Sequence, residues 1–302
     1  MRIFLMTLTI LSLLSVIVTS QVNATDSRTQ ELLRQARAAL GGEQALGGVQ
    51  SLTVVGDLRR MGERRDRTGE AKISILLPDK FKRVETMNLI ADVDVTLTTV
   101  LNGDQFWTDS SSSGGVNARI KSRTVSQDNS PQADRGRGRH MRLEFARQLA
   151  SLLLTSSPAF PVEFQYKGEA NSKDGAANVL ELRGPNGFSA LLFLDKTTHR
   201  PLMMTYKGVI PRTTVNTSTH RAGSEEEAER LLKDAKGGKA ATAAGPLEQG
   251  NWEVYFSDYR AVNGILLPHR INKSVNGKAW EELGIKKYKV NAALTGRDFE
   301  KR

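Results

Sequence analysis

The sequence predicts a mainly β (α+β) fold, in which a single curved antiparallel sheet of about 10–11 strands accompanies an N-terminal helix and a central apolar helix. Three observations predict it. Apolar and polar residues alternate over most of the chain, which is the period of strands with one buried face. Turn signals such as Asn102-Gly103 separate the alternating runs at hairpin spacing. Clear helical spacing of apolar residues occurs in the segments 29–40 and 141–154.

Composition narrows the classes of protein that the chain can belong to. It has 302 residues, of which 39% are hydrophobic and 25% charged, as in globular proteins. It has no cysteine, which excludes a disulfide framework, thiolate zinc sites, thiol catalysis and iron–sulfur chemistry. The net charge of +10 concerns solubility and partners rather than the fold.

Residues 1–24 have the pattern of a signal peptide. Arg2 supplies a basic start, residues 3–18 are largely apolar, and small residues surround a cleavage site near Ala24. The alternative is a membrane anchor, but the apolar run is shorter and more diluted than the roughly 20 residues that a spanning helix needs. We therefore expect export, with a soluble mature chain of residues 25–302. A protein without cysteine suits the bacterial periplasm.

The elements follow in order along the mature chain. The first helix is expected from Thr29, which can cap it, to Gly41-Gly42, which can end it. From residue 49 onward the hydrophobic period becomes two. Expected strands cover 51–61, 72–77, 81–87, 93–101, a return strand from 106, then 162–167, 179–183, 188–194, 201–207, 252–259, 265–274 and 278–290.

One domain accounts for these elements, with polar insertions at about 109–140 and 207–250. The first insertion is rich in arginine and lacks the apolar content to order itself. The second contains a charged segment, 224–236, that could form a helix. The central helix, 141–154, is apolar nearly all round and is therefore expected to be buried on most sides.

No constellation of residues indicates catalysis. The four histidines lack metal-ligand spacing, and the chain has neither a G-x-S-x-G nucleophile motif nor a phosphate-binding glycine loop. The carboxylate pairs Asp92/Asp94 and Glu281/Glu282 lie in strands, where neighbouring side chains point to opposite faces. We therefore expect no enzyme, no metal and no cofactor.

The basic insertion bears on possible partners. Nucleic acid is not expected, because the chain is exported and no aromatic residues lie between the charges for base stacking. The alternatives are a solvated loop and a contact with an acidic partner or anionic membrane surface, where each cation contributes about 1 kcal/mol. The cations concerned are Arg119, Lys121, Arg123, Arg135, Arg137 and Arg139. The chain is expected to be a monomer.

The apolar surface predicts a site of another kind. The strands share one apolar face, and the two helices are too few to cover it, so we expect a hydrophobic cavity that takes an apolar ligand. The alternative is an ordinary packed core. The expected cavity wall consists of Val93, Val95, Leu97, Leu101, Phe106, Phe145, Leu149, Leu152, Leu153, Val162, Phe164, Leu192, Leu194, Val254 and Phe256. A slip of one residue would exchange the two faces of any strand.

Several motifs resemble a known family. Pro78–Glu85 is similar to a Pro-x-x-Phe-Arg-x-Glu segment, and Asn102–Trp107 to the hairpin that follows it, in the periplasmic outer-membrane lipoprotein carrier superfamily (LolA/LolB-like). The strand end from Asn291 to Phe299 also fits. The resemblance implies a half-open, strongly curved sheet closed by helices, with an acyl chain of a lipid or lipoprotein in its cavity and 141–154 as the lid. In the carrier itself an inward arginine helps to hold the lid; Arg59 or Arg60 could take that place, but no motif fixes the match.

Two functions therefore remain open. The first is an exported, non-catalytic carrier or chaperone for a lipid or lipoprotein. The second is an exported interaction module with a packed sheet, which acts on a membrane-associated or acidic partner through its basic loop or its charged insertion.

Overall fold

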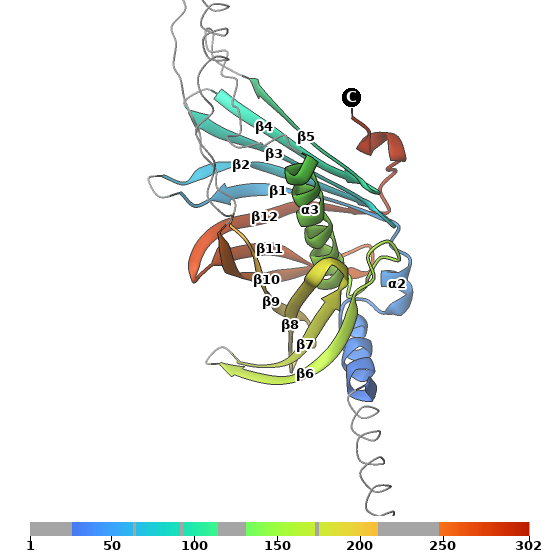
Figure 1. Ribbon diagram of the computed structural model, residues 1–302. Coiled ribbons are helices and arrows are strands. Elements are labelled where there is room, and N and C mark those ends of the chain that lie inside the picture. The colour runs from blue at the N-terminus through green and yellow to red at the C-terminus, as the bar shows by residue number, and fades with distance from the viewer. Residues whose placement is uncertain are drawn as a thin grey trace, which may run out of the picture.

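The computed structural model describes residues 26–62, 65–90, 93–113, 131–172, 175–210 and 248–301. The expected signal peptide and the expected helix at 224–236 lie outside these residues. The described strands form one antiparallel sheet (Figure 1). They are β1 (Ser51–Arg60), β2 (Arg67–Leu76), β3 (Lys80–Ile90), β4 (Val93–Asn102), β5 (Gln105–Ser113), β6 (Glu163–Ser172), β7 (Gly175–Gly184), β8 (Phe188–Asp195), β9 (Pro201–Val209), β10 (Gln249–Val262), β11 (Ile265–Val275) and β12 (Lys278–Val290).

The strand order is β5-β4-β3-β2-β1-β12-β11-β10-β9-β8-β7-β6. Strands that are adjacent in the sheet are also consecutive in the chain, with one exception: β1 pairs with β12 at the centre of the sheet. The strands β5 and β6, which follow one another in the chain, therefore lie at opposite edges. The segment between them has to cross the whole sheet, and it carries the long helix α3 (Pro131–Leu152) over one face (Figure 1).

The structure corrects two features of the expected sheet. Its described part has twelve strands instead of about ten or eleven, and it is open and not strongly curled (Figure 1). Alternation along a strand shows which face is buried, but it does not show how far strand twist bends the sheet. β5 gives a weak strand signal, because its second half is a run of serines.

The first helix, residues 26–39, packs its apolar side against the sheet, with Leu32, Ala36 and Leu40 buried. Thr29 is not its cap, because the helix begins earlier. The Thr29 side chain is buried, and its Oγ1 accepts a hydrogen bond from the backbone N–H of Tyr166 at 2.8 Å. The helix is thereby fixed to the edge strand β6. The short α2 (Glu43–Gly47) follows it.

The central helix begins ten residues earlier than its apolar pattern indicates. Residues 131–140, expected to belong to an unordered insertion, are helical, and α3 ends at Leu152 rather than at 154. The burial of its apolar C-terminal half accounts for this, because tertiary packing stabilises most helices in proteins. Of the helices in the described ranges, none is long and apolar enough to span a membrane.

Candidate functional site

The face of the sheet that α3 covers, here called the inner face, is built from apolar rows that cross several strands. Strand register places Leu52, Ile75, Phe81 and Leu101 side by side on β1 to β4. A second row crosses the other half of the sheet and consists of Val254, Met204, Leu192 and Leu180. All eight side chains are buried. The inner face is thus apolar in both halves of the sheet.

The helix α3 contacts both halves. The Phe145 ring meets the Phe81 ring edge-on, with 6.3 Å between centroids. Gly138 packs against β5, since a Cβ built on it would lie 3.2 Å from the Phe106 Cβ. On the other side, Arg139 donates a hydrogen bond to the carbonyl of Asn186, in the turn before β8. The helix therefore bridges the inner face.

The structure brings most of the expected wall residues together around α3. Leu101, Phe145, Leu149, Leu152, Leu153, Val162, Leu192, Leu194, Val254 and Phe256 belong to one buried cluster, with Phe106 and Phe164 partly buried against it. Val95 and Leu97 lie on the inner face of β4 and are only half-buried. The side chain of Val93 lies outside the described residues. That this surface binds a ligand stays a prediction.

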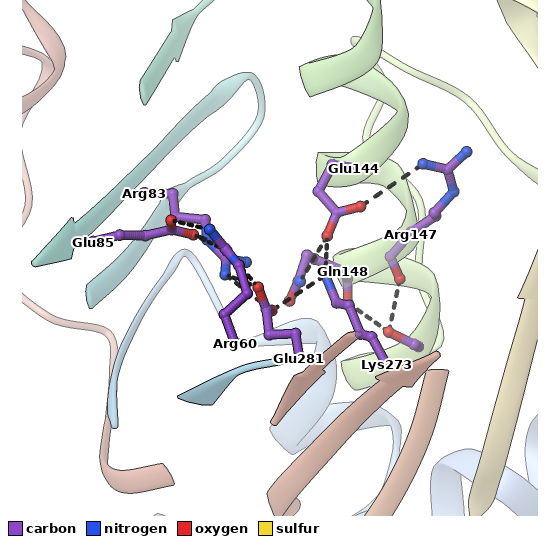
Figure 2. A network of polar contacts seen from close by, with 9 residues as sticks. Arg60, Arg83, Glu85, Glu144, Arg147, Gln148, Lys273 and Glu281 are labelled. Carbon is purple, nitrogen blue, oxygen red and sulfur yellow. Dashed lines mark hydrogen bonds and ion pairs between the residues drawn. The ribbon is translucent and has the colours of Figure 1, made fainter. Parts of the chain in front are cut away.

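A network of charged side chains interrupts the apolar inner face (Figure 2). Glu281 on β12 accepts hydrogen bonds from Arg60 at 2.7 Å and from Arg83 at 2.9 Å. Both arginines also bond to Glu85 on β3. The Glu281 side chain is only 5% exposed and that of Glu85 9%. Of the two arginines considered from the sequence, Arg60 lies on the inner face, whereas Arg59 points to the opposite face, where it pairs with Asp66.

The network continues to α3 through β11. The Lys273 ammonium lies 2.9 Å from a Glu144 carboxylate oxygen on the helix and 3.8 Å from Glu281. Arg147 approaches Glu144 at 3.7 Å, and its guanidinium carbon lies 3.7 Å from the centre of the Tyr206 ring. An ion pair thus joins the middle of the helix to the middle of the sheet (Figure 2).

The cations keep the buried carboxylates ionised. Burial raises the pKa of Glu144, but Lys273 and Arg147 outweigh it and lower that pKa to about 2. Burial likewise opposes ionisation of Glu281, and Arg83, Lys273 and Arg60 together hold its pKa well below the usual range. These groups are therefore charged at neutral pH. Each is engaged with its neighbours, so the network is suited to holding structure rather than to proton transfer.

The structure describes only some of the cations that we expect to contact a membrane or an acidic partner. Arg119, Lys121 and Arg123 lie outside the described residues, as does the side chain of Arg135. Arg137 and Arg139 belong to α3, where Arg139 donates a hydrogen bond to another part of the chain.

Among the residues that the structure describes, no group of three His, Asp or Glu side chains could hold a metal ion. Asp94 is exposed, as expected, and Asp92 is not described.

Sequence reasoning missed the charge network, although a signal for it was present. Arg83 and Glu85 have the same parity as Phe81 along β3, so a strand with Phe81 buried must also turn both charges inward. Two opposite charges placed two residues apart on the buried face of a strand form the pattern that could have indicated the charge network.

The chain is similar in structure to a LolA superfamily protein from Nitrosomonas europaea, with 11% identity, a TM-score of 0.44, and coverage of 90% of this chain and 97% of that one. It is also similar to a Vibrio parahaemolyticus domain assigned to outer membrane lipoprotein sorting (11% identity, TM-score 0.43, coverage 90% and 96%). A DUF1329 family protein from Desulfovibrio piger is similar at 10% identity and a TM-score of 0.43, with coverage of 90% and 97%. The likeness is one of fold alone. No family model and no curated protein matches the sequence.

Proposed function

We propose that this chain is an exported, non-catalytic carrier that holds an acyl chain of a lipid or lipoprotein on the inner face, next to α3. The observation that carries the proposal is the extent of the apolar inner face. Its rows cross both halves of the sheet, and on β4 they continue to Val95 and Leu97, which remain half-buried. An acyl chain would complete the burial of this surface.

The free energy of burial is sufficient for such a ligand. Each buried CH₂ contributes about 0.8 kcal/mol, so a chain of about 14 carbons gains roughly 11 kcal/mol before association costs of several kcal/mol. The helix has to move aside for the chain to reach the buried rows. Its ionic link to the sheet, Lys273 to Glu144, opposes such movement only weakly, because a largely buried ion pair contributes little net stability and its groups are well solvated when exposed.

Export rests on the signal-peptide pattern of residues 1–24. The non-catalytic character rests on the charged groups of the network on the inner face, which bind one another across four strands and the helix. The carrier is favoured over the interaction module because Arg139, one of the cations that the module would use, already donates a hydrogen bond to the carbonyl of Asn186 in the same chain.

Uptake of a fluorescent fatty acid by the purified mature chain tests the proposal, together with native mass spectrometry of protein prepared from a periplasm. We expect one bound acyl chain, and binding at least tenfold weaker in Leu97→Asp, which places a charge on the inner face of β4. Thr98→Asp is the matched control, because it places the same charge on the opposite face of the same strand. Equal loss in both variants, or neither uptake nor co-purified lipid in the unchanged chain, would overturn the proposal.

A further inference from the structure

The outer face of the sheet, opposite α3, carries a groove where the C-terminal tail passes over the central strands. Its volume is about 420 Å³. Three of its lining residues are lysines, and most of the others are apolar. The lysine groove is lined by Thr53, Val55, Lys72, Lys287, Lys289, Ala292, Ala293 and Leu294.

Strand register brings the three lysines together. Val55 on β1 pairs with Lys72 on β2 and with Lys287 on β12, so these two lysines flank it in one row across three strands. Adjacent strands lie about 4.8 Å apart, which places the backbones of the two lysines roughly 10 Å apart. Lys289 pairs with Thr53 and lies on the same face, two residues along β12 from Lys287. The three side chains therefore surround one apolar position.

Hydrogen bonds fix the wall that the tail provides. The Asn291 side chain accepts from the backbone N–H of Gln50 at 2.8 Å and donates to the carbonyl of Gly48 at 3.0 Å. The Ser51 hydroxyl donates to the carbonyl of Ala292 at 2.7 Å. The wall of the groove that the tail provides is thus held in place by hydrogen bonds to the start of β1 and the residues before it.

The charge of the groove is uncompensated. Lys72, Lys287 and Lys289 are exposed, and within the described ranges none of them has an acidic partner. The neighbouring Lys286 differs, because it pairs with Asp57. Three positive charges around an apolar floor are complementary to a ligand that joins an anionic group to an apolar one.

We propose that the lysine groove binds the phosphate headgroup of an anionic phospholipid and so docks the chain on an anionic bilayer. The lysines contact the phosphate, while Val55 and Leu294 contact the apolar part beside it. The lysine groove lies on the face opposite the proposed acyl site. A carrier that docks through the groove therefore keeps α3 and the acyl site directed away from the bilayer. Each cation near such a surface strengthens binding about fivefold at low ionic strength, and added salt weakens the effect.

Sedimentation of the full mature chain with vesicles tests this inference. We expect binding to phosphatidylglycerol–phosphatidylcholine vesicles and not to phosphatidylcholine vesicles. The triple variant Lys72→Gln, Lys287→Gln, Lys289→Gln is expected to bind about 100-fold more weakly. The matched control is Lys167→Gln, Lys196→Gln, Lys286→Gln, which removes the same charge from lysines paired with carboxylates, and its binding should change less than about threefold.

The other outcomes overturn the inference. Equal loss in both triple variants would show diffuse charge attraction, and unchanged binding in the groove variant would place the membrane contact elsewhere. Displacement from vesicles by inorganic phosphate at low concentration would show a site for free anions rather than for a bilayer. The groove variant should keep fatty-acid uptake, so failure of this inference leaves the carrier proposal standing.

Discussion

Replacement of Glu281 by Gln is expected to lower the free energy of unfolding by about 3–5 kcal/mol, as when one partner of a buried ion pair is removed. The Glu281 side chain is 5% exposed, and its carboxylate faces Arg60, Arg83 and Lys273. The variant keeps the shape of the side chain but leaves three partly buried cations with only Glu85 and Glu144 to balance them. Urea denaturation followed by circular dichroism measures the loss.

Glu282→Gln is the matched control, because the adjacent side chain points to the outer face and pairs there with Arg59 and Arg270. Surface pairs of this kind contribute about 0–1 kcal/mol. A loss in Glu281→Gln no larger than in the control would contradict the structural role of the network.

The pH dependence of stability gives a second readout of the same variant. Because the folded chain holds the pKa of Glu281 below its unfolded value of about 4.3, the stabilisation is complete above that pKa and is lost as the pH falls. The unchanged protein should therefore lose stability from about pH 5 downward, with Glu144 contributing down to its pKa of about 2. Glu281→Gln should show a shallower decline over the same range.

A disulfide between α3 and β5 is expected to abolish fatty-acid uptake. The chain contains no cysteine, so Phe106→Cys and Gly138→Cys together introduce a single pair of thiols. The 3.2 Å between the Phe106 Cβ and a Cβ built on Gly138 is close to the 3.5–4.5 Å of natural disulfides, so the bond needs only a small shift. With the N-terminal half of α3 fixed to the edge strand, the helix cannot move away from β4 and β5. Uptake is measured in the oxidised and the reduced protein.

The two single-cysteine variants and the reduced double variant are the controls, since they carry the same side-chain changes without the bond. Each should take up fatty acid at least tenfold faster than the oxidised double variant. Uptake by the oxidised protein at the rate of the reduced protein would show that the ligand does not pass between α3 and β5.

Much of the sheet could be predicted from the sequence, because its strands are joined by short turns with recognisable residues. Asn263-Gly264 and Asn276-Gly277 lie between adjacent strands, and Asn102-Gly103 lies where β4 ends; Asn263 and Asn276 have the positive φ that such turns require. The pairing of β1 with β12 could not be predicted in this way, because it joins residues more than 200 positions apart and no local signal specifies it.

The buried charges escaped prediction for a different reason. The alternation rule places charged residues on the solvent side, and Glu281 appeared only as half of a carboxylate pair on an ordinary strand. Its inward position is favourable because Arg60 lies opposite it in the central β1–β12 pairing and Arg83 reaches it from β3. The side chains that neutralise it come from strands that the sequence alone does not bring together. The start of α3 was missed similarly, since residues 131–140 are polar and their helix depends on packing of the segment after them.

The most direct test of the carrier proposal is the position of a bound acyl chain. A fatty acid with a photoreactive group at its methyl end is cross-linked to the mature chain, and the labelled peptides are identified by mass spectrometry. We expect the label on α3 between Met141 and Leu152 and on the inner-face side chains of β4 and β10, such as Leu97 and Val254. Label found only on the outer face, including the lysine groove, would contradict the account.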